Sequence, residues 1–236
     1  MTRARTAVGV LALLVAGCTD LSPSVEPSGD GGDGGGGDTT VRGDNPVLTP
    51  VDPGEAEVLA PSELCVVGED SDVLACETSD IGPELVGWRL WDDVAGVRRF
   101  EVFRNAGTGG MQMYLVARDP EGDWTDVKVN QAEVTGDDAD ELLVGFRTSD
   151  GDILQLDIVD FGHGQLTHRE LEGGAARAVR DGIETWSGRY VGSDELCCPS
   201  EFDYEFLQYD DSDNVESWFI ADSGVVSARQ VPDTEL

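Results

Sequence analysis

From Leu59 to the C-terminus, short β-prone runs alternate with turn sequences, and this pattern restricts the fold more than any other feature. Along Ile153–Phe161, apolar residues recur at every second position and therefore share one face of a strand. Asp150-Gly151 and Asp181-Gly182 lie between such runs and are typical of tight hairpin turns. The candidate strands are Val97–Phe103, Met111–Arg118, Trp124–Val129, Glu141–Arg147, Ile153–Phe161, Gln165–Leu171, Ala176–Arg180, Ile183–Val191, Phe202–Tyr209, Val215–Ala221 and Val225–Val231.

The pattern predicts an all-β, mainly antiparallel domain, because only Gly174–Val179 hints at helical periodicity. Two apolar segments, Phe100–Arg104 and Leu143–Arg147, align with each other about forty residues apart. Such a period suits a four-stranded propeller blade, but three or four units are too few for a closed ring. We therefore expect meander or hairpin repeats that form a curled sheet, in a sandwich-like or partial-propeller-like domain.

The N-terminus has the pattern of a secretory signal: Arg3 and Arg5 precede an apolar run, Ala7–Ala16, that ends in small residues. This run is about half of the ~20 residues that a membrane span needs. The sequence Val15-Ala16-Gly17-Cys18 resembles the lipobox of bacterial lipoproteins. That resemblance implies cleavage before Cys18, a diacylated thiol and an acylated amine such as a palmitoyl amide. We expect an extracytoplasmic protein that its N-terminal lipid anchors to the bacterial cell membrane.

Three regions follow from composition. Residues 1–17 form the lipoprotein signal peptide. Residues 18–57 are rich in Gly, Asp, Pro and Ser, bury almost nothing, and are expected to form a lipidated, disordered tether. Residues 58–236 are long enough for a single all-β domain with a sizeable core.

The chain is strongly acidic, with 48 Asp and Glu against 15 Lys and Arg and a formal net charge of −33. This charge argues against a nucleic-acid partner, because phosphates attract basic proteins. It also argues against adhesion of the polypeptide to anionic lipid, so the acyl anchor must supply the membrane affinity. We expect a monomer whose partner is an envelope protein or a glycan.

Four cysteines remain besides Cys18, and an even number in an exported domain indicates disulfides. Cys65 and Cys76 flank a turn-like sequence, which fits a local bridge. The adjacent Cys197 and Cys198 either form a vicinal disulfide or reach back to the first pair. The Cys-Cys-Pro-Ser sequence at residues 197–200 resembles an element of bacterial envelope lipoproteins whose function is not assigned.

The acidic stretch from Glu133 to Gly145 resembles the FG-GAP/VCBS repeats of propeller domains and bacterial surface proteins. Those repeats place oxygen ligands at loop positions one, three, five and nine, with glycine at position six. The resemblance implies a weak Ca²⁺ site at Glu133, Thr135, Asp137 and Glu141, and oxygen ligands are those that Ca²⁺ prefers. Asp138 stands at the glycine position. The alternative interpretation is a solvated acidic turn.

No nucleophile elbow, phosphate-binding glycine loop or H-E-x-x-H helix is present, so we name no catalytic residue. His163 falls in Gly162-His163-Gly164, where an exposed turn histidine is expected. Large aromatic side chains dominate burial in small β domains, so the tryptophans are expected in the core rather than on a sugar-binding surface. The sequence therefore favours a non-catalytic binding or structural module. The alternative is an extracytoplasmic hydrolase with a carboxylate-based site.

Overall fold

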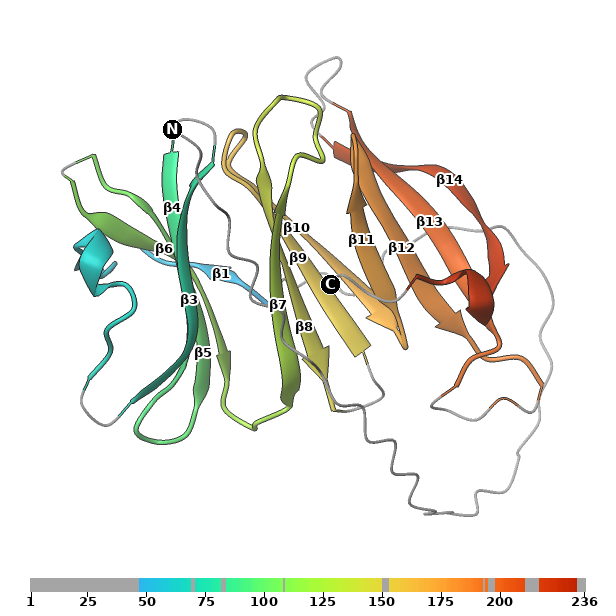
Figure 1. The fold of residues 1–236 in the computed structure, drawn as a ribbon, viewed down its shortest axis with the longest axis horizontal. Coiled ribbons are helices and arrows are strands. Elements are labelled where there is room, and N and C mark those ends of the chain that lie inside the picture. Colours follow the sequence, from blue (N-terminus) through green and yellow to red (C-terminus); the bar gives the residue numbers. More distant parts are fainter. Residues whose placement is uncertain are drawn as a thin grey trace, which may run out of the picture. The chain divides into compact units, whose positions relative to one another are not determined.

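The computed structural model describes residues 47–68, 71–81, 84–107, 109–149, 153–192, 194, 198–210 and 217–232, all within one compact unit, Thr40–Leu236. Its main elements are three antiparallel meanders, each of four strands that pair in chain order (Figure 1). The first meander comprises β3 (Asp72–Ile81), β4 (Glu84–Asp92), β5 (Arg98–Asn105) and β6 (Met111–Asp119). The second comprises β7 (Trp124–Ala132), β8 (Glu141–Thr148), β9 (Ile153–Asp160) and β10 (Gln165–Glu172). The third comprises β11 (Ala175–Val179), β12 (Gly182–Arg189), β13 (Glu201–Asp210) and β14 (Ser217–Ser227). The predicted all-β antiparallel fold is confirmed.

Strands β5 to β13 coincide with predicted runs to within a few residues. The two C-terminal runs form one strand, β14, with a bulge at Ala221 opposite Phe206 and Leu207. A bulge admits one extra residue without ending the strand, so the polar sequence after Ala221 does not make a turn. Of the segment Gly174–Val179, residues Ala175–Val179 form β11 rather than a helix. Strands β3 and β4 were not predicted.

The middle sheet has apolar clusters on both faces. On one face, Val144 and Phe146 belong to a cluster that includes Phe100 of the first sheet, and the two phenylalanine rings meet edge to face at 5.7 Å. On the other face, Leu143 belongs to a cluster that includes Ile183 of the third sheet. Strand β8 is therefore buried on both sides, which explains its nearly continuous apolar sequence.

The three sheets repeat with a longer period than the sequence suggested. Their first strands begin at Asp72, Trp124 and Ala175, about fifty residues apart. The segments Phe100–Arg104 and Leu143–Arg147 lie in the third strand of the first sheet and the second strand of the middle sheet, respectively. Their similarity therefore reflects a shared strand pattern rather than equivalent positions.

The segment before β3 packs on the first sheet. Its two-residue strands β1 (Thr49–Pro50) and β2 (Val58–Leu59) both pair with β6. Leu48 is completely buried, and its N–H donates to the carboxylate of Asp157 at 2.6 Å; the other oxygen of Asp157 lies 2.6 Å from Nδ1 of His168. Residues 47–57, assigned to the tether from composition, therefore belong to the folded domain.

The predicted local disulfide is confirmed: Cys65 bonds to Cys76, which joins the N-terminal segment to β3. The alternative in which Cys197 and Cys198 reach back to this pair is therefore wrong. Cys197 lies outside the described residues, so the vicinal disulfide stays a prediction. Cys18, the signal peptide and the first part of the tether, residues 18–46, also lie outside them.

Candidate functional site

The acidic turn between β7 and β8 adopts a left-handed backbone at two positions. Gly136 has φ = 86° and Asp138 has φ = 66°. Asp138 stands where the repeat family has glycine, and aspartate tolerates this conformation better than most side chains do. Asp137 supports the turn, because its Oδ1 accepts a hydrogen bond from the N–H of Ala139 at 2.8 Å.

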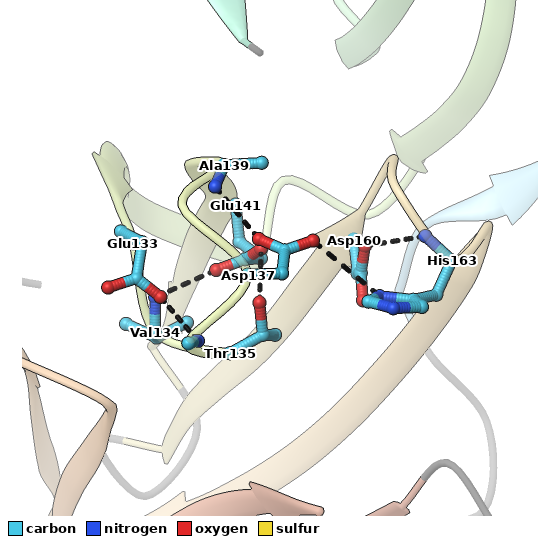
Figure 2. Close-up of polar contacts among 9 residues, drawn as sticks. Glu133, Val134, Thr135, Asp137, Ala139, Glu141, Asp160 and His163 are labelled. Carbon is cyan, nitrogen blue, oxygen red and sulfur yellow. Dashed lines mark hydrogen bonds and ion pairs between the residues drawn. The ribbon is translucent and has the colours of Figure 1, made fainter. Parts of the chain in front are cut away.

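Glu141, the first residue of β8, turns its carboxyl group into the protein and is only 1 % exposed. Its Oε2 accepts from the N–H of Val134 at 2.8 Å and its Oε1 from Oγ1 of Thr135 at 3.0 Å (Figure 2). The pKa of Glu141 is raised to about 7: burial raises it most, the nearby carboxylates of Asp160 and Asp137 also raise it, and the two hydrogen bonds offset part of this rise. Glu141 therefore exchanges a proton near neutral pH.

A second carboxyl group, Asp160 at the end of β9, is 2 % exposed and holds His163. Its Oδ1 accepts from the N–H of His163 at 2.9 Å, and its Oδ2 lies 2.7 Å from Nδ1 of the ring. Oδ2 of Asp137 is 3.9 Å from the same nitrogen, and the ring of Tyr209 lies 5.4 Å away. His163 does lie in a turn, but its side chain is only 23 % exposed because these groups enclose it.

The structure brings together two of the four predicted calcium ligands, Thr135 and Glu141, which are bonded to each other. Glu133 instead accepts a hydrogen bond from the N–H of Gly136. Among the residues described, no three His, Cys, Asp or Glu side chains are arranged to hold a metal ion. The calcium site therefore stays a prediction.

Sequence reasoning missed the connection between the acidic turn and the Asp160–His163 pair. The two segments are about twenty residues apart, and the pairing of Leu142 with Val159 places the start of β8 beside the end of β9. The only local signal was the spacing of Asp160 and His163, which suits a side chain that folds back on its own turn.

A larger site lies on the outer face of the first sheet, between β4–β6 and the segment 51–68. A cavity of about 710 Å³ opens there. The strands supply Arg89, Trp91, Arg99, Glu101 and Arg118 to its lining. Carboxylates from the N-terminal segment contribute as well, namely Glu55, Glu57 and Glu63.

The floor of the cavity contains a buried ion pair. Arg89 and Glu101 are 4 % and 3 % exposed, and Nε of the arginine lies 2.6 Å from Oε2 of the glutamate. Nη2 of Arg89 reaches Glu57 at 3.1 Å, so the pair also connects the sheet to the N-terminal segment. Removing one partner would leave an uncompensated buried charge, so the two side chains fix each other's position.

Trp91, Arg99 and Arg118 form a row across β4, β5 and β6, because Trp91 pairs with Arg99 and Arg99 pairs with Arg118. Arg99 binds Asp93 through Nη2 at 2.7 Å, and this hydrogen bond lowers the pKa of Asp93. Arg118 is exposed and makes no ion pair with any described residue. The row is therefore rich in hydrogen-bond donors within an acidic protein.

The tryptophans divide between core and surface. Trp124 and Trp186 are buried, as expected, whereas Trp88, Trp91 and Trp218 are partly exposed. The cavity had one signal in the sequence: five of the fifteen basic residues lie between residues 89 and 118. Their position on one side of a sheet could not be known without the strand register.

Comparisons with known proteins add no relative: no protein-family model matches the chain, and neither a curated protein nor a solved structure is significantly similar to it. In the described part of the chain, no helix is both long and apolar enough to cross a membrane.

Proposed function

We propose that this protein is a lipid-anchored component of the bacterial cell envelope that acts as a non-catalytic binding module. The cavity over β4–β6 is its binding site. The observation that carries this proposal is the composition of the cavity: a tryptophan, three arginines and several glutamates line a space of about 710 Å³. Small-molecule pockets commonly have volumes of roughly 300–1,000 Å³ with a few convergent polar groups.

The lipid anchor rests on the sequence Val15-Ala16-Gly17-Cys18. Two or more acyl chains hold a protein on a membrane durably, and a tether rich in Gly and Asp would give the domain reach above the surface. Expression of the full chain in bacteria with labelled palmitate tests this part. We expect label in the wild-type protein and none in Cys18→Ala, which should also leave the membrane fraction. Label in the variant would contradict the anchor.

The lining of the cavity favours binding over catalysis. It includes neither the acidic turn nor a histidine. Its buried charges, Arg89 and Glu101, neutralise each other, and Glu57 completes their contacts. This ion pair fixes the floor of the cavity in one conformation. A preformed site reduces the free-energy cost of ordering side chains around a ligand.

A second candidate function, an extracytoplasmic hydrolase, is favoured by the pKa of about 7 at Glu141 and by the Asp160–His163 pair next to it. A carboxyl group with this pKa suits a general acid at neutral pH. Both oxygens of Glu141 accept hydrogen bonds from the chain, however, which suits a structural role. Turnover of an envelope glycan that is lost in Glu141→Gln and kept in Gly68→Trp would favour the hydrolase.

Binding is tested with the full lipidated chain in detergent, presented with soluble fragments of envelope glycan. Gly68→Trp should abolish binding, because Gly68 lines the cavity and an added Cβ there meets no atom within 4 Å. Gly224→Trp is the matched control: a Cβ at this position on β14 also meets nothing within 4 Å, and Gly224 does not line the cavity. Equal binding by both variants would overturn the proposal.

A further inference from the structure

We propose that the row Trp91–Arg99–Arg118 binds the oxyanion of a small, hydroxyl-bearing acid, such as a uronate or a sugar phosphate. This inference rests on the proposed function, because it names the class of ligand that the same cavity takes. It is carried by the unused donors in the row and by the carboxylates on the N-terminal segment that lines the cavity with it.

The register of the sheet brings the three side chains together. Residues that pair directly across adjacent strands have Cβ atoms about 4.5–5.5 Å apart and lie on the same face. Trp91 pairs with Arg99, and Arg99 pairs with Arg118. The guanidinium carbon of Arg99 also lies 5.3 Å from the centre of the Trp91 ring. The three side chains therefore form one continuous edge of the cavity.

Two members of the row have donors that the protein leaves unused. The indole Nε1–H of Trp91 is buried and finds no acceptor among the described residues. Arg118 has no ion pair there, although it lies directly opposite a second arginine. A buried donor without an acceptor is unfavourable, and Arg118 is the unpaired charge of the row because Arg99 is paired with Asp93. An oxyanion bound beside them would neutralise the guanidinium of Arg118, and a turn of the Trp91 ring would bring its buried N–H to the same oxyanion.

The carboxylates of the N-terminal segment further restrict the class of ligand that the cavity can bind. Glu55, Glu57 and Glu63 line the cavity together with the row. The chain as a whole carries a net charge of −33. This field repels a ligand with many negative charges, whereas hydroxyl groups can donate to the glutamates. A molecule with one acidic group and several hydroxyls therefore complements both the arginine row and the glutamates better than a neutral sugar or a polyanion does.

The test uses the full lipidated chain in detergent and titrates it with galacturonate, galactose 1-phosphate and galactose while tryptophan fluorescence is recorded. We expect at least one acidic sugar to bind more tightly than galactose. Arg118→Gln should weaken that binding about tenfold or more, because it removes a charged donor without orphaning an acid. Trp91→Phe should weaken it about fivefold, because it removes the N–H and keeps a ring.

Arg229→Gln is the control, because it changes the net charge by the same amount as Arg118→Gln. Arg229 is exposed and does not line the cavity. Binding of galacturonate alone would identify a carboxylate source, and binding of galactose 1-phosphate alone would identify a phosphate source. Either result supports the inference. Equal affinity for galactose and the acids, with no effect of Arg118→Gln, would overturn the inference about the ligand. The proposal that the cavity is the binding site would survive this result if Gly68→Trp still abolished binding. If none of the three binds, the inference is also overturned.

Discussion

Arg89 and Glu101 lie directly opposite each other on β4 and β5, and their side chains form a buried ion pair at 2.6 Å beneath the cavity over β4–β6. Exposed ion pairs contribute little to stability, but an unpartnered charge left behind in a buried site is costly. We expect Arg89→Met to lower the free energy of unfolding by about 3–5 kcal/mol.

The double variant Arg89→Met/Glu101→Leu should cost less than Arg89→Met alone, because it removes both charges from the buried site. Urea unfolding of the wild type, both single variants and the double variant measures the coupling. Costs that simply add would contradict a direct interaction between the two side chains.

The raised pKa of Glu141 implies a specific dependence of the free energy of unfolding on pH. Its pKa in the folded protein is about 7, above the ordinary value of 4.5, so the folded state holds the proton more tightly than the unfolded state does. The contribution of this group to stability is therefore complete below about pH 4.5 and is lost as the pH rises toward 7. The full shift corresponds to roughly 3 kcal/mol.

Glu141→Gln tests this dependence, because an amide can accept from Val134 and donate to Thr135 without ionising. With chelator present, the free energy of unfolding of the variant should vary less between pH 4.5 and pH 8 than that of the wild type. Parallel curves for the two proteins would show that Glu141 does not titrate in this range.

Calcium binding at the predicted site should depend on pH. A cation at Glu141 must displace its proton, so Ca²⁺ should raise the melting temperature more at pH 8 than at pH 6. Calcium at about a hundred times its Kd would add roughly 2.7 kcal/mol. The variant Glu133→Gln/Asp137→Asn should lose the effect. Thermal unfolding with calcium and with chelator measures it, and no shift at either pH would leave the stretch as a solvated acidic turn.

The disulfide between Cys65 and Cys76 should matter for both stability and binding. It closes a loop with a sequence separation of 11, for which loop entropy gives about 3 kcal/mol. Cys65→Ser/Cys76→Ser should lower the free energy of unfolding by about this amount. It should also weaken glycan binding, because the released segment lines the cavity. Unchanged affinity in a folded variant would mean that the segment takes no part in the site.

The fold was predictable where alternation was strong and strands were apolar, as in β8 and β9. It was missed where Asp72–Ile81 mixes acidic and polar residues, because β3 lies at the edge of its sheet and is half exposed. The C-terminal strand was split because Asp222–Gly224 has the sequence of a turn, although these residues pair regularly with β13 beyond the bulge at Ala221.

The candidate sites were predictable only in part, because the register of the strands decides which distant residues lie together. The acidic turn is contiguous, so its residues could be named from the sequence. Asp160 reaches it only through the pairing of β8 with β9. Arg89 and Glu101 were invisible as a pair because a buried arginine and a surface arginine have the same sequence pattern until the cross-strand partner is known.

Hydrogen exchange of the full chain, with and without soluble fragments of envelope glycan, shows whether the cavity over β4–β6 is the binding site. We expect slower amide exchange in the presence of the fragments at residues 51–68 and along β4–β6, with no change in the turn between β7 and β8. Slower exchange confined to that acidic turn, or to β14, would contradict this assignment.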